Sequence, residues 1–189
     1  MALSDPVGRQ HLHTRQLEMR GFRRDDGLWD IEGHLTDVKT YGFRNDWRGQ
    51  IEPGTPVHDM WIRLTIDSRL TVQDIAVATD ASPYRICPDI APNFESIKGL
   101  TIGPGWSRRV KERLGGTKGC THLVEMLGAL ATVAIQTLVA ERKEFDAQAD
   151  AAPRRPAFLD TCHALASDSE VTERFWPQFY TGSREPNRS

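Results

Sequence analysis

The strongest constraint on the fold is a series of four segments in which apolar and polar residues alternate. These segments lie at about residues 11–20, 28–40, 57–66 and 70–80. A period of two places successive side chains on opposite faces of a β-strand. The first two segments are joined by Asp25-Asp26-Gly27, and Asp-Gly between alternating segments favours a hairpin. Because consecutive strands usually pair, the sequence predicts a four-stranded antiparallel meander.

Residues 121–147 carry the clearest helical pattern in the chain. Apolar residues recur there at three- and four-residue steps, which predicts one apolar helix face made of Leu123, Leu127, Leu130, Ala134 and Leu138. Short helices are expected at 89–98 and 107–114. The predicted fold class is therefore α+β: the meander packs against this long helix of the C-terminal half and against the short helices, in a single domain over residues 1–148.

Two segments fall outside this predicted scaffold. Residues 42–56 are rich in Gly, Pro, Asn and Arg, which predicts a long loop of the kind that often carries function. Residues 149–189 are expected to form a linker, over 149–156, and a C-terminal segment. This segment is too apolar for a free tail, so we expect it to pack back on the domain.

Composition excludes several classes of protein. The 189 residues include 24 Lys+Arg and 26 Asp+Glu, and a net charge of −2 without a basic block gives no reason to expect a nucleic-acid partner. The longest apolar stretch, residues 126–139, is interrupted by polar residues and is too short to span a membrane. Three cysteines cannot all pair, and the first residues lack the apolar core of a signal peptide. We expect a reduced, cytoplasmic protein.

The candidate catalytic residues are His13, Arg15 and His58. His13 and Arg15 share one face of the first strand, and His58 begins the third strand on its apolar face. An arginine directed toward an apolar face needs an acid to answer it, and histidine beside a carboxylate is the usual construction of a general base. We therefore expect these three side chains to line one cavity. A hydrogen-bonded core histidine is the alternative explanation for each of them.

The candidate substrate-binding residues surround that cavity in the prediction. Tryptophan offers flat walls for aromatic ligands, and at least one of Trp29, Trp47, Trp61 and Trp106 is expected to form a wall. Ordinary core packing is the alternative. Arg15 and Lys39 are expected to hold a carboxylate or phenolate. The nearest acids in sequence to answer Arg15 are Asp30 and Glu32, although their strand parity is opposite to that of apolar Ile31.

A thiol and an imidazole, Cys120 and His122, stand at the predicted start of the long helix. A helix N-terminus lowers the pKa of a thiol, so Cys120 is a candidate nucleophile or metal ligand, with His122 beside it. A buried, unreactive thiol is the alternative. Zinc or iron would require ligands from distant segments, for example His58, Cys87, Cys120 and His122, because no Cys-x-x-Cys or His-Glu-x-x-His is present.

Several short motifs together resemble a bacterial family known as domain of unknown function 2889. The resemblance covers about residues 10–145 and rests on His13-Thr14-Arg15, the stretch Asp25-Asp26-Gly27-Leu28-Trp29-Asp30-Ile31-Glu32-Gly33 with Asp37 and Lys39, Pro56-Val57-His58-Asp59-Met60, Leu64-Thr65-Ile66-Asp67 and Gly119-Cys120-Thr121-His122-Leu123. It implies no particular activity. It singles out as motif positions His13, Arg15, Asp30, Glu32, Lys39, His58, Cys120 and His122.

The functional expectation is a small-molecule catabolic enzyme that uses acid–base chemistry without a cofactor. A lyase fits best, releasing a small aldehyde such as formaldehyde from an aromatic or hydroxylated acid, and a hydrolase is the other enzymatic option. The alternatives are a metal-binding or iron–sulfur carrier protein and a ligand-binding module without chemistry. If a second copy covers the long helix, the protein is a homodimer.

Overall fold

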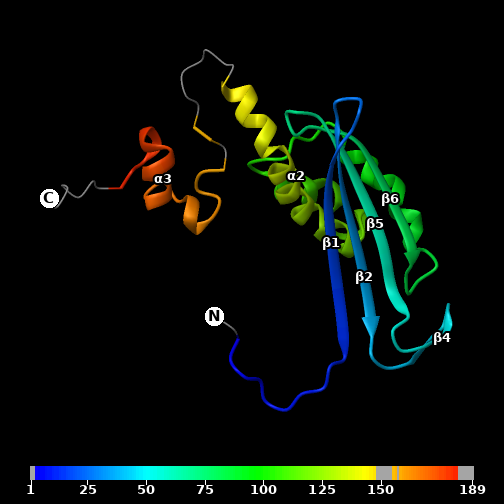
Figure 1. Cartoon of the computed structure of the whole chain (residues 1–189). Helices are drawn as coiled ribbons and strands as arrows, with labels where there is room; N and C mark the ends of the chain where they lie inside the picture. The colour runs from blue at the N-terminus through cyan, green and yellow to red at the C-terminus, as the bar shows by residue number, and fades with distance from the viewer. Residues whose placement is uncertain (1–2, 148–154, 157, 183–189) are drawn as a thin grey trace. The chain divides into compact units, whose positions relative to one another are not determined.

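The computed structural model describes residues 3–147, 155–156 and 158–182. Its main element is a four-stranded antiparallel sheet made of β1 (His13–Arg23), β2 (Trp29–Lys39), β5 (Pro56–Ile66) and β6 (Val72–Ala81). The strands lie in the order β1-β2-β5-β6, so each strand pairs with its neighbour along this series (Figure 1). The predicted meander is confirmed. Gly27, in the hairpin between β1 and β2, has a φ of 82°, a conformation that glycine adopts without strain.

One face of the sheet forms the floor of the core. On β2, Ile31 and Leu35 point to this face and are completely buried, while the intervening side chains are partly exposed. The register of β2 with β5 sets these residues opposite Leu64 and Met60, which are buried as well. Directly opposed residues of an antiparallel pair lie on the same face. The alternation read from the sequence therefore separates the core face from the outer face correctly.

The core face is covered by α2 (Thr121–Ala147), with α1 (Trp106–Leu114) and the 3-10 segments η1 (Cys87–Ile97) and η2 (Gly116–Lys118) beside it (Figure 1). The predicted α+β class is confirmed. The apolar stripe lies in the core as expected, with Leu123, Leu127, Leu130, Ala134 and Leu138 all buried. Trp106 ties α1 to α2, since its indole N–H donates to the carbonyl of Leu127 across 3.0 Å.

The packing of α2 on β1 depends on a close approach at Gly21. A Cβ added at Gly21 would lie 2.0 Å from Oγ1 of Thr137 on α2. Only a glycine lets the helix lie this close to the strand at that position. By length and composition, residues Thr121–Leu138 of α2 would also suffice to cross a membrane. Core helices of globular domains pass the same test, and the buried stripe makes this helix a part of the core.

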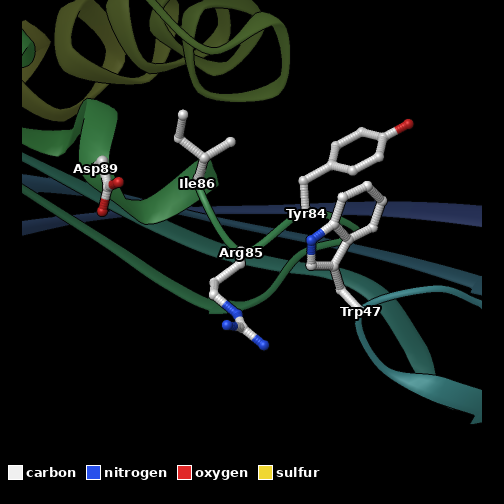
Figure 2. A pocket seen from close by; sticks show the side chains of 5 residues that line it. All are labelled: Trp47, Tyr84, Arg85, Ile86 and Asp89. Atoms are coloured by element: carbon white, nitrogen blue, oxygen red, sulfur yellow. The ribbon is translucent and has the colours of Figure 1, made fainter.

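The predicted loop at 42–56 contains a small hairpin, which corrects its description as a plain loop. Its strands are β3 (Phe43–Asn45) and β4 (Gly49–Ile51), and they form a separate two-stranded sheet. The side chain of Asn45 explains the turn, because its Oδ1 accepts hydrogen bonds from the backbone N–H groups of Trp47 and Arg48. The turn places the ring of Trp47 against the ring of Tyr84, which lies in the segment after β6 (Figure 2).

The chain divides into two compact units, Met1–Lys143 and Glu144–Ser189. The described part of the second unit contains η3 (His163–Leu165), α3 (Glu170–Phe175) and η4 (Pro177–Phe179). Ser169 caps α3 by accepting a hydrogen bond from the backbone N–H of Thr172. Most of the predicted linker, at 149–154, lies outside the described residues. The packing of the C-terminal segment on the first unit stays a prediction.

Candidate active site

A buried carboxylate, Asp37, stands at the centre of the candidate site. Asp37 lies on the core face of β2, two residues after Leu35, and only 3% of its surface is exposed. A carboxylate in such a place is costly unless charged or polar groups satisfy it. Asp37 must therefore have charged or polar partners close by.

The strand register supplies three partners on the same face. Asp37 lies opposite Arg15 on β1 and opposite His58 on β5, and His13 lies two residues before Arg15. The two nitrogens Nε and Nη2 of Arg15 donate to Oδ1 and Oδ2 of Asp37 across 2.9 and 2.8 Å. Nε2 of His13 bonds to Oδ1, and Nδ1 of His58 bonds to Oδ2, each across 2.9 Å. These four bonds occupy the acceptor positions of the carboxylate.

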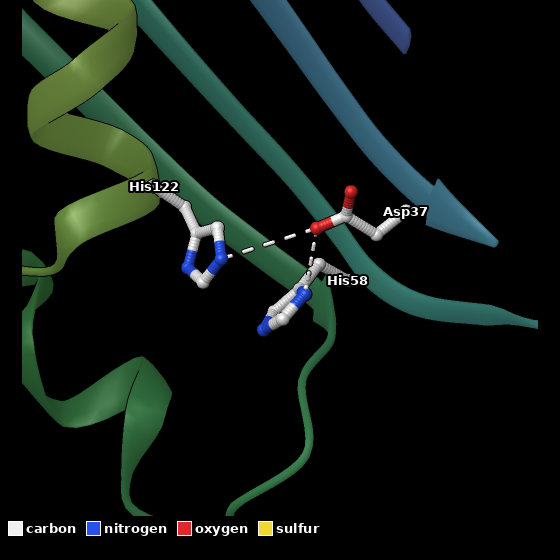
Figure 3. A group of neighbouring side chains, drawn as sticks. All are labelled: Asp37, His58 and His122. Carbon is white, nitrogen blue, oxygen red and sulfur yellow. Dashed lines mark hydrogen bonds and ion pairs between the residues drawn. The ribbon is translucent and has the colours of Figure 1, made fainter. Parts of the chain in front are cut away.

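The first turns of α2 add a second layer to this cluster. Glu125 accepts a hydrogen bond of 2.8 Å from Nη1 of Arg15, which ties the helix to β1. The ring of His122 packs on the ring of His58, with centroids 3.9 Å apart, and Nε2 of His122 lies 3.9 Å from Oδ2 of Asp37 (Figure 3). The other ring nitrogen of His122 lies 3.8 Å from the sulfur of Cys120.

The contacts determine the protonation states. Burial by itself would raise the pKa of Asp37, but hydrogen bonds from Arg15 and His13 outweigh it and lower this pKa to about 2. Burial lowers the pKa of His58, and the neighbouring His122 lowers it further, against the opposing effect of Asp37. Burial also lowers the pKa of His122, followed by the charge of Arg15. Asp37 is thus ionised, while the two packed imidazoles favour their neutral forms.

A β-bulge shapes the strand next to His58. The pairing of β2 with β5 shifts between Asp37 and Val38, so that Val57 has no partner on β2. Bulges commonly occur beside active sites, where they redirect a side chain. Here the irregularity lies immediately before His58.

The cluster opens into a cavity of about 250 Å³. Its lining combines the charged cluster with one apolar residue and consists of His13, Arg15, Asp37, Lys39, Val57 and His58. Lys39 pairs with no carboxylate of the described residues, and its ammonium lies 4.4 Å from the ring centroid of Phe43. Arg15, by contrast, is held by Asp37 and Glu125. The cation available to an anionic ligand is therefore Lys39.

Three donor groups of the cluster could also hold a metal ion. One ligand atom each from Asp37, His58 and His122 lies within 4.8 Å of the others, and two histidines with one carboxylate are a known ligand set for zinc and non-haem iron. A metal bound by Oδ2 of Asp37 and Nδ1 of His58 would have to displace the hydrogen bond between these two atoms.

Comparison with known proteins gives one match. The family described as "Protein of unknown function (DUF2889)" matches residues 13–136. The chain belongs to the DUF2889 family. The matched region begins at His13 and includes every residue of the cluster, Glu125 among them. No curated protein and no solved structure matches the chain.

The three candidate catalytic residues of this DUF2889 protein thus line one cavity, but the expected tryptophan wall is wrong. None of the residues that line this cavity is a tryptophan. Trp29 and Trp106 are buried in the core. Trp61 lies on the outer face of the sheet, and Trp47 lines a different cavity.

Asp30 and Glu32 also lie away from the cavity, on the outer face. Asp30 accepts hydrogen bonds from Thr65 and Arg24, and Glu32 accepts one from Arg63. The acid that answers Arg15 is Asp37, which sequence reasoning missed as a site residue. Its strand parity was the available signal, because Asp37 shares the face of Ile31 and Leu35.

This DUF2889 protein has a second histidine–aspartate pair, on the opposite face of the sheet. Nε2 of His34 bonds to Oδ1 of Asp59 across 2.7 Å, and the ring of His34 stacks on Trp61 at a centroid distance of 3.7 Å. The side chain of Asp59 is 26% exposed, against 4% for Asp37. This outer pair has the same chemical groups as His58 and Asp37 but is more exposed to solvent. Variants of the outer pair can therefore serve as controls for variants of His58 and Asp37.

Proposed function

We propose that the protein is a small-molecule enzyme in which His58 acts as a general base oriented by Asp37. The observation that carries the proposal is the bond from Nδ1 of His58 to the buried carboxylate of Asp37, beside an open cavity. A histidine oriented by a carboxylate is the usual arrangement of a catalytic base. The proposal needs no organic cofactor.

The bond to Asp37 selects the tautomer of His58. An ionised carboxylate only accepts hydrogen bonds, so Nδ1 must carry the proton and Nε2 must carry the lone pair. Nε2 has no hydrogen-bond partner among the described residues. A lowered pKa keeps this imidazole neutral near pH 7, which leaves Nε2 free to accept a proton from a substrate.

The charges around the cavity favour an anionic substrate. Lys39 supplies the cation for a carboxylate or a phenolate, and His13 borders the cavity with a side chain that is 46% exposed. Arg15 is a positioning residue in this account, because its guanidinium holds Asp37 and Glu125. A volume of about 250 Å³ lies just below the range of typical ligand pockets and suits a small acid.

In its finer form, the proposal is a lyase that releases formaldehyde from a hydroxymethyl-bearing aromatic or hydroxylated acid. The hydroxyl proton moves to Nε2 of His58, the bond to the hydroxymethyl carbon breaks, and the oxygen electron pair forms the C=O of formaldehyde. The electron pair of the broken C–C bond stays on the substrate carbon that carried the hydroxymethyl group, where the neighbouring acidifying groups stabilise it. The imidazolium then returns its proton to that carbon, so the enzyme ends unchanged.

A metal-binding protein is the second candidate function, and the Asp37–His58–His122 group is the observation in its favour. Metal analysis of the purified protein separates the two candidates. About one equivalent of zinc or iron, lost in the His122→Gln variant, would support the metal centre. A metal-free protein with full activity would support the acid–base enzyme.

The test of the proposed enzyme is a screen of hydroxymethyl-bearing aromatic acids for formaldehyde release. General base catalysis contributes on the order of a hundred- to ten-thousand-fold, so His58→Gln should lose at least about a hundredfold in rate. His34→Gln, in the outer pair, should keep full activity. Incorporation of ¹⁸O from water into the acid product, and not merely into the formaldehyde, which exchanges its oxygen with water, would indicate a hydrolase instead. Equal rates for His58→Gln and the unchanged protein would overturn the proposal.

A further inference from the structure

A second cavity, of about 470 Å³, lies between the β3–β4 turn and the segment that follows β6 (Figure 2). It is lined by Trp47, Tyr84, Arg85, Ile86 and Asp89 and shares none of its lining residues with the cavity at His58. Its volume falls in the range of small-molecule sites.

The aromatic side chains of this cavity are unusually exposed. Trp47 is 53% exposed and Tyr84 is 52% exposed, although their rings meet edge-on at a centroid distance of 5.2 Å. Ile86 beside them is 73% exposed. Exposed apolar residues that gather in one place, rather than singly, mark a binding surface.

Hydrogen bonds from side chains to backbone carbonyls hold together the segments that line this cavity. The amide nitrogen of Asn45 donates to the carbonyl of Pro83 across 3.1 Å, which joins the turn of Trp47 to the segment of Tyr84. Arg48 donates to the carbonyls of Pro56 and Val57 and so attaches the same turn to β5. A preformed site avoids part of the entropy cost of binding.

The charged groups of the cavity define the kind of ligand. Arg85 forms no ion pair with any other described residue, and neither does Asp89. In Figure 2 the carboxylate of Asp89 lies at the opposite end of the labelled group from Trp47, and the guanidinium of Arg85 projects from the chain between them. An unpaired guanidinium binds a carboxylate in a bidentate manner, and an unpaired carboxylate accepts a hydrogen bond from a hydroxyl.

We infer that this second cavity binds a flat, hydroxylated aromatic carboxylate. The ring lies against Trp47 and Tyr84, the carboxylate pairs with Arg85, and the hydroxyl donates to Asp89. The assignment stands whether or not His58 is a base, because it uses none of the residues of the first cavity.

The test is binding of 3-hydroxy-2-naphthoate, whose hydroxyl and carboxylate are neighbours on one side of the ring system, to the full chain, measured by calorimetry. A hydrogen-bonded charge pair supports a change of about ten- to a hundredfold in Kd for Arg85→Gln, and loss of the aromatic wall about three- to tenfold for Trp47→Leu. Removal of the probe's hydroxyl, in 2-naphthoate, should weaken binding, and Asp89→Ala, which leaves no acceptor at this position, should abolish this difference between the two probes.

Matched controls keep the result specific. Arg69→Gln and Trp61→Leu remove the same side-chain types from exposed positions elsewhere and should leave the Kd unchanged. His58→Gln should also bind the probe as before. Circular dichroism verifies that each variant folds. Absence of probe binding, or binding that is lost in His58→Gln and Lys39→Gln but kept in Arg85→Gln and Trp47→Leu, would overturn the inference.

Discussion

Nδ1 of His58 lies 2.9 Å from Oδ2 of Asp37, a carboxylate that also accepts hydrogen bonds from Arg15 and His13. This one contact joins the buried charge of β2 to a ring that borders a cavity. It fixes which imidazole nitrogen is free, and it links the stability of the sheet end to the proposed chemistry.

Asp37→Asn should destabilise the fold by about 3–5 kcal/mol, because it removes one partner of a buried ion pair. The amide nitrogen introduced by this change is a donor placed among donors from Arg15 and His58. Urea denaturation monitored by circular dichroism measures the loss. Asp59→Asn is the matched control, since Asp59 bonds to His34 on the outer face, and it should cost less than about 1 kcal/mol. Equal losses at the two positions would contradict the role given to Asp37.

The free energy of unfolding should fall as the pH is lowered below about 6.5. Burial lowers the pKa of His58 and of His122 from the ordinary value of 6.5, so in this window the unfolded chain binds protons that the folded chain does not. Proton binding to the unfolded state pulls the equilibrium toward unfolding. Urea titrations between pH 7.5 and pH 5 measure this slope. The slope should be shallower in a His58→Gln/His122→Gln variant, and a stability that rises with acid would contradict the account.

Gly21→Ala should destabilise the packing of α2 on β1, because its methyl group would lie 2.0 Å from Oγ1 of Thr137. Overpacking of this kind typically costs about 1–3 kcal/mol. The double variant Gly21→Ala/Thr137→Ala should recover most of that loss, as residues in contact are not additive. Thermal or urea unfolding of the unchanged protein, the two single variants and the double variant gives the coupling free energy between residues 21 and 137. An additive result would mean that helix and strand do not meet at this point.

Leu127→Ala and Leu130→Ala should each cost about 2–5 kcal/mol, since both side chains are fully buried in the core. Thr132→Ala, on the exposed side of the same helix, is the control and should change stability by about 0.5 kcal/mol or less. Denaturant titrations compare the three variants. Equal losses of stability in all three variants would mean that the helix face with Leu127 and Leu130 is not the face that packs on the sheet.

The fold followed from the sequence where periodicity was strong. Alternation in β2 and β5 identified the core face, and the leucine spacing identified the buried side of α2, because each pattern is set by local backbone geometry. The hairpin of β3 and β4 was missed since its strands are too short to show alternation. Its turn is stabilised by the side chain of Asn45, a contact that alternation does not reveal.

The site was predictable in part, for a related reason. Strand parity brought His13, Arg15 and His58 to one face, but the acid that answers Arg15 was sought among Asp30 and Glu32. The pairing register between β1 and β2 decides this point, and it sets Arg15 opposite Asp37. The contribution of His122 and Glu125 depends on how α2 lies over the sheet, which no periodicity in the sequence specifies.

The most direct test of the central claim is ¹⁵N NMR of the imidazole rings at pH 7, with the His58 signals assigned from the His58→Gln spectrum. The account predicts a neutral ring with the proton on Nδ1, a lone pair on Nε2 and a pKa below 6.5. A ring that is charged at pH 7, or neutral with its proton on Nε2, would leave no base facing the cavity and would contradict the account.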